Sequence, residues 1–351
     1  MIRYRTAYLL VGALLWSVPA SAALTKSAIA AEEGPRLGWL ERFQESRQGP
    51  EQTERVSETH KVSADATLDL SHVAGDVRVT TGRDNEIRIE AVKRVRHRDS
   101  EEGKRLLGLL RVDVNQFGSR LEVRTIYPRT STRSLSASVD YTITVPATAA
   151  ISIKTVSGDV SVTGVRGEVR AETVSGDVDV VQTPNLALAK AVSGDVRARD
   201  IGTETSLLLS TVSGSVIASA LKVRTLEAGS VSGNVDLTNL EVERLLAKTI
   251  NGDISYDGLV TRGGRYEFNA HSGNVRIALA NPSGFEIDAS TFSGSIRSDF
   301  PVTLRATSRD ERDTSRQRST VSSRSIRGTF GDASAILSVR SFSGTVVITK
   351  K

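Results

Sequence analysis

Thr155-Val156-Ser157-Gly158-Asp159-Val160 is the stretch that decides the fold, because it recurs along the chain at a nearly constant spacing. It returns almost unchanged at 173–178 and again at 191–196. Looser copies follow, and the copies together carry their glycines at Gly158, Gly176, Gly194, Gly214, Gly233, Gly252, Gly273, Gly294 and Gly344. The spacing is 18 to 21 residues up to Gly294 and then 50 residues. Self-similarity at a fixed period of this length is typical of a solenoid.

The apolar residues around each glycine indicate a bend. Ile151 and Ile153 precede Gly158 at odd positions, whereas Val160 and Val162 follow it at even positions. We assign to the second, inward set the apolar residues just before each glycine, namely Val156, Val212, Phe292 and Phe342. A one-residue slip turns the apolar face of a strand outward, so a slip repeated at one motif position indicates a corner, which glycine accommodates. The sequence therefore predicts an all-β parallel β-solenoid with rungs of about 19 residues and structural corners at these glycines.

The N-terminal part of the repeat region follows the same plan more loosely. Leu68, Leu70 and Gly75, with Val77 and Val79, resemble a first rung. The charged stretch 94–111 interrupts it, with Glu101 and Glu102 ahead of the apolar run 106–110. We predict a short helical insertion here that covers the open end of the stack, since solenoids need atypical caps. Strands are expected around 112–114, 121–123 and 139–145.

The first residues have the features of an export signal. Arg3 and Arg5 precede an apolar run over 7–18, and the small-residue site Ala20-Ser21-Ala22 follows. A retained membrane anchor is the alternative, but the run is shorter than the ~20 residues that span a bilayer. We predict a signal peptide over 1–22, a flexible leader over the polar, aperiodic residues 23–61, and the solenoid domain over 62–351. The mature chain is then exported to the periplasm, cell surface or exterior, without a transmembrane span.

Composition narrows the classes of function. The chain has 0 cysteines, which excludes disulfides, thiolate nucleophiles and zinc–thiolate sites. Hydrophobic residues make up 38% and aromatic residues only 5%, so the core must consist mainly of Val, Ile, Leu and Ala. The net charge of +5 suits an anionic envelope glycan or lipid headgroups. A protein partner, or a merely solvated basic surface, is the alternative, and export makes nucleic acid a poorer fit.

A basic loop over 306–325 interrupts the last repeats. A long polar loop inside a compact array is either functional or disordered. Its arginines and those beside it are candidate anion-binding residues: Arg305, Arg309, Arg312, Arg316, Arg318, Arg324 and Arg327.

Three aspartates are candidate metal ligands. Asp159, Asp177 and Asp195 fall on successive rungs, and stacked carboxylate oxygens suit calcium. The later copies carry Ser215 and Asn234 at this position, which favours the alternative that these residues form turns.

Enzymatic activity is the competing class, because some solenoids cleave polysaccharides. Glycosidic cleavage needs a pair of carboxylates, and no acidic pair is distinguished by its spacing. The histidines are scattered, at His60, His72, His97 and His271. We therefore predict no catalytic residues and no cofactor, and a non-enzymatic protein of the cell envelope or surface that acts as an adhesin or as a structural or binding scaffold. The alternative is a polysaccharide-acting solenoid enzyme.

The repeated Val-Ser-Gly-Asp-Val motif resembles that of the bacterial putative adhesins, a β-solenoid family labelled as a domain of unknown function. The stretch Asp140–Pro146 that leads into the repeats and the closing stretch Ser341–Thr345 also fit, so that the resemblance covers residues 62–351. It implies export and association with the surface or envelope, and it brings no catalytic or binding residues.

Overall fold

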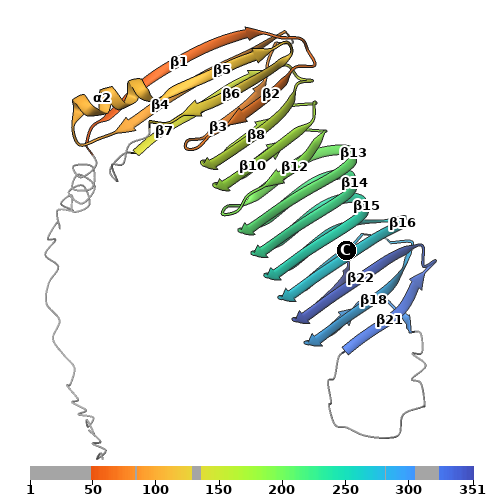
Figure 1. Cartoon of the computed structure of the whole chain (residues 1–351). Coiled ribbons are helices and arrows are strands. Elements are labelled where there is room, and N and C mark those ends of the chain that lie inside the picture. Colours follow the sequence, from red (N-terminus) through yellow and green to blue (C-terminus); the bar gives the residue numbers. More distant parts are fainter. Residues whose placement is uncertain (1–48, 84, 129–135, 281, 305–323) are drawn as a thin grey trace, which may run out of the picture. The chain divides into compact units, whose positions relative to one another are not determined.

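The structure is a computed structural model that describes residues 49–83, 85–128, 136–280, 282–304 and 324–351. Their 23 strands join in one hydrogen-bonded sheet, in which long parallel strands lie side by side (Figure 1). None of the helices in this part is long and apolar enough to cross a membrane.

The central strands form the parallel stack. They are β8 (Ala150–Ser157), β9 (Val160–Thr163), β10 (Val169–Ser175), β11 (Val178–Val181), β12 (Leu186–Lys190), β13 (Val196–Ser213), β14 (Val216–Ser232), β15 (Val235–Asn251), β16 (Ile254–Ser272) and β17 (Val275–Leu279). Equivalent residues of successive repeats are in register, as in the column Val160, Val178 and Val196. The predicted parallel β-solenoid is therefore confirmed, because each repeat pairs with the repeats on either side of it.

Each middle rung has three inward runs of apolar side chains. In one rung these are Val216 with Ala218, Leu221 with Val223, and Leu226 with Ala228, all at most 4% exposed. Each buried Val or Leu side chain contributes about 1.5–3 kcal/mol. Ala220 bends the chain between the first two runs with φ 54°, and Asp200 and Asn239 have nearly the same φ on the adjacent rungs. The sequence analysis predicted one corner in each rung, at the glycine, and these further bends were missed because no glycine marks them.

The N-terminal end combines a first parallel rung with antiparallel strands beside it. The strands are β1 (Glu51–Lys61), β2 (Thr67–Ser71), β3 (Val77–Thr81), β4 (Glu86–Arg96), β5 (Arg111–Phe117), β6 (Arg120–Ile126) and β7 (Ser136–Val145). β2 and β3 form the first rung and pair in parallel with β8 and β9. β6 with β5 extends one side of this rung, and β7 with β4 and β1 extends the other.

The predicted flexible leader over 23–61 is wrong for its last 11 residues, which form β1. β1 pairs along its whole length with β4, and its carboxylates meet basic side chains there: Glu51 bonds Arg96 Nη2 at 2.6 Å and Glu54 bonds Lys93 at 3.2 Å. A strand at the edge of a sheet that packs only lightly shows a weak apolar alternation, which is why these residues seemed aperiodic. Residues 23–48 lie outside the described part.

The predicted helical insertion is confirmed as α2 (Ser100–Leu109). Asp99 is its N-cap and accepts hydrogen bonds from the backbone N–H groups of Glu101 and Glu102, which satisfies donors that a helix start leaves unpaired. Leu106 and Leu107 are buried, and α2 lies against β1 and β4 (Figure 1). The helix thus covers the antiparallel N-terminal end.

The last rungs do not stack in sequence order. Their strands are β18 (Gly284–Ser293), β19 (Ile296–Ser298), β20 (Thr303–Leu304), β21 (Arg324–Gly331), β22 (Ala335–Ser343) and β23 (Val346–Lys350). β22 pairs in parallel with both β16 and β18, so the final repeat of the chain lies between two earlier ones (Figure 1). β21 then pairs antiparallel with β18 and covers the far side. An interior rung is therefore made by the C-terminal residues.

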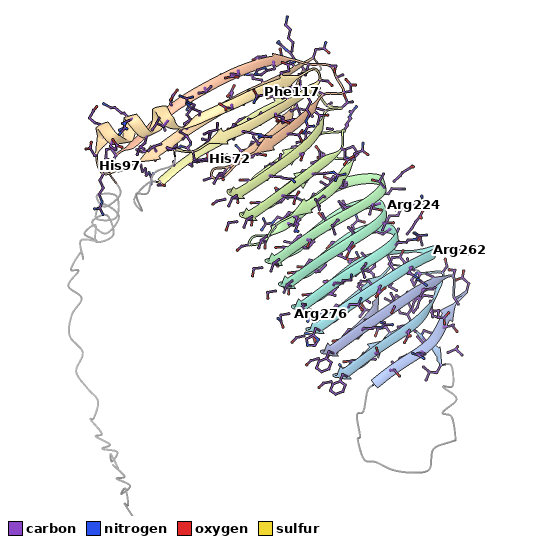
Figure 2. All side chains as sticks on the ribbon, in the orientation of Figure 1. His72, His97, Phe117, Arg224, Arg262 and Arg276 are labelled. Carbon is purple, nitrogen blue, oxygen red and sulfur yellow. The ribbon has the colours of Figure 1, made fainter. Side chains whose placement is uncertain are left out.

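His72 is buried where the N-terminal strands meet the stack, and it lies in the N-terminal part of Figure 2. Its Nδ1 lies 3.0 Å from Thr125 Oγ1, and its ring packs edge-on against Tyr141. Nε2 has no hydrogen-bond partner among the described residues. Burial lowers the pKa of His72 to about 4, against weaker opposing effects that include the charges of Asp140 and Asp76.

We expect His72 to make the stability depend on acidity. The unfolded chain binds the proton near pH 6.5, whereas the folded chain binds it only near pH 4, so stability falls as the pH is lowered through this window, by about 3 kcal/mol. Urea unfolding from pH 7 to pH 4 should show this loss in the native chain and in the exposed control variant His271→Gln. His72→Phe should lack that component, and an unchanged pH slope in this variant would contradict the assignment.

Candidate binding surface

The corner glycines are held against one another. At Gly176 φ is 136°, and a Cβ placed there would collide with the carbonyl oxygen of Gly158 on the preceding rung. Gly194 has φ 143° and lies in the same way against Gly176. The other glycines that the sequence analysis placed at corners also have positive φ, as does Gly75 at 122°. The corners of successive rungs therefore approach so closely that no side chain fits between them.

Buried hydroxyl groups support six of the corners from inside. Three residues before its glycine, a Thr or Ser side chain points inward and donates a hydrogen bond to the carbonyl oxygen of the corner glycine on the adjacent rung. The bonds are Thr173 to Gly158 at 3.2 Å, Thr211 to Gly194 at 2.8 Å, Ser230 to Gly214 at 2.8 Å, Thr249 to Gly233 at 2.9 Å, Thr291 to Gly344 at 3.1 Å and Ser341 to Gly273 at 3.3 Å. The sequence analysis missed this role, although the recurring Thr at the start of the motif was its signal.

The apolar residue after each of these hydroxyls points outward. These residues form one column along the corner edge, which we call the corner ridge: Val73, Val156, Val174, Val192, Val212, Val231, Ile250, His271, Phe342 and Phe292. Its nine apolar side chains are 38–48% exposed. The assignment of Val156, Val212, Phe292 and Phe342 to the inward set is therefore wrong, because the face changes at the glycine and not before it. The ridge is the longest exposed apolar feature of the described residues.

The ridge is aromatic at its C-terminal end. The rings of His271, Phe342 and Phe292 stack, with centroids 4.9 and 4.8 Å apart and interplanar angles of 7° and 2°. His271 is exposed in this stack. The order of the three rings follows the interior placement of β22, so residues distant in sequence meet here.

The aspartates after the corner glycines bind backbone. Asp159 Oδ1 accepts the N–H of Asp177 at 2.8 Å, and Asp177 Oδ1 accepts that of Asp195 at 2.8 Å. Arg197 bridges the second oxygens of Asp177 and Asp195 at 2.6 and 2.5 Å. Partial burial opposes ionisation of Asp177, but the hydrogen bonds from Arg197 and from the backbone outweigh it and keep its pKa below the usual value. The carboxylates are thus occupied by neighbouring rungs.

In the described part of the chain, no group of three or more His, Asp or Glu side chains is placed to hold a metal ion. The calcium hypothesis for Asp159, Asp177 and Asp195 thus gains no further ligand from the fold.

Most of the basic loop lies outside the described residues. This applies to Arg305, Arg309, Arg312, Arg316 and Arg318. The backbone of Arg324 belongs to β21, and Arg327 on the same strand bonds Asp288 Oδ1 at 3.1 Å. The anion-binding hypothesis for this loop therefore remains a prediction.

A column of mostly basic side chains runs beside the ridge, on the strands that lead into the corners and two residues before the ridge position. Lys154, Lys190, Lys248 and Arg340 occupy equivalent outward positions, with Glu172 among them. A hollow of about 440 Å³ opens between this column and the ridge, over β15, β16 and β22. A second hollow, of about 690 Å³, lies at another bend of the rungs, and its basic residues are paired with carboxylates: Lys222–Glu241 at 3.1 Å, Arg224–Glu243 at 3.4 Å and Arg262–Asp332 at 3.5 Å.

A stack of parallel rungs with an exposed ridge and shallow hollows defines the chain as a β-solenoid. Comparison with known families agrees, because the sequence model of the Toastrack DUF4097 family matches residues 65–349. The chain belongs to this family, and the resemblance drawn from the Val-Ser-Gly-Asp-Val repeats is confirmed.

Several crystal structures are similar to this chain. One is a Bacteroides fragilis protein described as a "putative adhesin", with 15% identity and a TM-score of 0.40, covering 85% of this chain and 97% of that one. Another is a Parabacteroides distasonis protein described as a "putative lipid binding protein", with 12% identity and a TM-score of 0.41, covering 85% and 96%. No curated protein matches the chain.

Proposed function

We propose that this chain is an exported, non-enzymatic protein of the cell envelope or surface that binds through its exposed faces, as an adhesin or binding scaffold. The observation that carries the proposal is the corner ridge, which continues from Val73 to Phe292 across every rung of the stack. A linear surface of this kind suits an extended or planar partner better than a compact small molecule. Exposed apolar patches of this length mark interaction sites.

The charge beside the ridge indicates the chemistry of the partner. The net charge of the chain is +5, and basic residues line one flank of the ridge. An anionic envelope glycan or anionic lipid headgroups would complement such a surface. The export signal read from 1–22 brings the chain to the compartment where these partners occur.

The first test is co-sedimentation of the mature chain with purified envelope fractions and polysaccharides across a salt series. We expect saturable binding that weakens as salt rises, because the cationic flank contributes to it. A chain lacking residues 306–325 measures the contribution of the basic loop separately.

Variants test the ridge itself. The triple variant Val192→Ser, Val212→Ser and Val231→Ser should lose most of the binding. The matched control is Leu208→Ser, Leu259→Ser and Ile336→Ser, which removes three apolar side chains of similar exposure that lie off the ridge. Equal binding by both triple variants, or no binding by the native chain to any fraction, would overturn the proposal and favour a protein partner or the solenoid enzyme.

A further inference from the structure

The two ends of the corner ridge differ in the size of their side chains. Six valines occupy the first rungs, whereas Ile250, His271, Phe342 and Phe292 occupy the last four. Ile250, Phe342 and Phe292 are 47–48% exposed although their rings or branches are large. Phenylalanine has a larger apolar surface than valine, and here about half of that surface is left in water. A partner that covers the ridge therefore buries more apolar area per rung on the last four rungs than on the first six.

The two ends also differ in charge on the side that follows the glycine. The first rungs carry Asp76, Asp159, Asp177 and Asp195 at the first position after the corner. Around the aromatic rings these positions hold neutral Asn274, Thr345 and Ser295. Asp253 remains at this position on the Ile250 rung, where Arg276 binds it at 2.9 Å, but beside the three rings no carboxylate stands at this position to repel an anionic partner.

Basic side chains flank the aromatic end on both sides. Lys248 and Arg340 lie on β15 and β22, which lead into their corners, and Arg276 and Arg297 lie on β17 and β19, which follow their corners. Lys248 pairs with Glu227 at 3.4 Å and Arg276 with Asp253 at 2.9 Å. Among the described residues, exposed Arg340 and Arg297 have no carboxylate partner. Two cations are therefore free to meet phosphate.

The hollow lies at this same end. Its walls include Lys248, Asn269 and Arg340 on one side and Ile250, His271 and Phe342 on the other, around a volume of about 440 Å³. A charged group seated between the cations would thus lie directly beside an apolar wedge. An acidic glycan offers no apolar layer to these rings, whereas a bilayer interface offers headgroup phosphates and acyl chains at adjacent depths.

We propose that the aromatic end of the corner ridge docks on an anionic lipid bilayer. Phe342 and Phe292 enter the boundary between headgroups and acyl chains, while Lys248 and Arg340 bind headgroup phosphates from the hollow. The combination of an apolar wedge with a basic patch provides the two attractions that stable peripheral binding needs. The inference rests on the proposed function and narrows its partner to a membrane surface.

The test is sedimentation of the full mature chain with phosphatidylcholine vesicles, with and without phosphatidylglycerol. We expect binding only with phosphatidylglycerol, and a decrease with added salt. Phe292→Ser with Phe342→Ser, and separately Lys248→Glu with Arg340→Glu, should each weaken partitioning about tenfold or more. The substituted side chains are exposed, and the melting temperature of each variant verifies that it folds.

Matched controls use the other parts of the surface. Leu208→Ser with Leu259→Ser removes two exposed apolar side chains that lie off the ridge, and Arg224→Glu with Arg262→Glu makes the same charge change at the opposite edge of the strands from Arg276 (Figure 2). Both controls should bind vesicles as the native chain does. Equal binding to neutral vesicles, or equal losses in controls and test variants, would overturn the inference.

The outcome also separates this inference from the proposed function. Binding to envelope polysaccharides without binding to either vesicle would refute membrane docking and leave the adhesin proposal standing. Failure to bind vesicles and envelope fractions alike would refute both.

Discussion

Gly176→Ala should lower the free energy of unfolding by about 3 kcal/mol or more, which combines backbone strain with a steric collision. At φ 136° an alanine pays a conformational cost that glycine does not. Its Cβ would also meet the carbonyl oxygen of Gly158, which is fixed by the stack and cannot move like the end of a flexible side chain. Urea unfolding followed by far-UV circular dichroism measures the loss.

Substitutions at two other glycines measure the backbone strain of positive φ apart from the steric collision of an added Cβ. Gly263 also has positive φ, at 73°, but a Cβ there meets nothing within 4 Å. Gly263→Ala should therefore cost only about 1–2 kcal/mol, the price of the left-handed conformation. Gly202 lacks positive φ and has equally open surroundings, so Gly202→Ala should leave stability nearly unchanged.

The ranking of these variants is the decisive result. If Gly176→Ala costs no more than Gly263→Ala, the close approach of successive corners does not limit side chains, and the corner assignment for the repeated glycines fails. The same substitution at Gly194, which lies against Gly176 in the same way, provides an independent repeat of the measurement.

The sequence predicts the corner glycines well because the backbone geometry at each corner restricts the residue type. A backbone with positive φ pressed against another backbone leaves glycine as the only residue that fits, so each rung repeats it. The bends at Ala220 and its equivalents carry no such mark, because Asp200 and Asn239 adopt similar angles without strict selection. Three inward runs per rung therefore had to be read from the structure.

The direction of the ridge residues was misjudged for a geometric reason. In Thr155-Val156-Ser157-Gly158, alternation alone places either Thr155 or Val156 inside. Valine is the more apolar, and yet Thr155 is 5% exposed and Val156 48% exposed. In six other rungs the hydroxyl at this position donates a hydrogen bond to a corner carbonyl, which offsets the cost of burying it, whereas Thr155 Oγ1 has no partner among the described residues and keeps its place by the register of the stack. Hydrophobicity alone does not contain this information.

The candidate site was the least predictable part. The ridge joins His271 to Phe342 and then to Phe292, and this order depends on β22 entering the stack between β16 and β18. Repeats with nearly the same motif fit one another in any order, so local sequence does not specify which rung lies inside. Only the full set of pairings brings the aromatic rings together.

That interior placement predicts which of two equivalent substitutions is the more harmful. Val346 and Ile296 occupy the same position after their corners and face each other in register. Val346 is fully buried between Val275 and Ile296, whereas Ile296 on β19 is half-buried. Val346→Asp should cost about 3–5 kcal/mol, the cost of an uncompensated buried charge, while Ile296→Asp should cost about 1–2 kcal/mol because water reaches it.

The measurement is urea unfolding at pH 7, with Val347→Asp as the control, since this neighbouring side chain points away from the core. Burial disfavours the charged form of an introduced carboxyl, so the loss in Val346→Asp should shrink as the pH falls toward 4, whereas the control should show little such change. If the rungs stacked in sequence order, β23 would be the outermost strand and β19 an interior one. Ile296→Asp would then be the more destabilising of the two, and that reversed ranking would refute the insertion of the last rung.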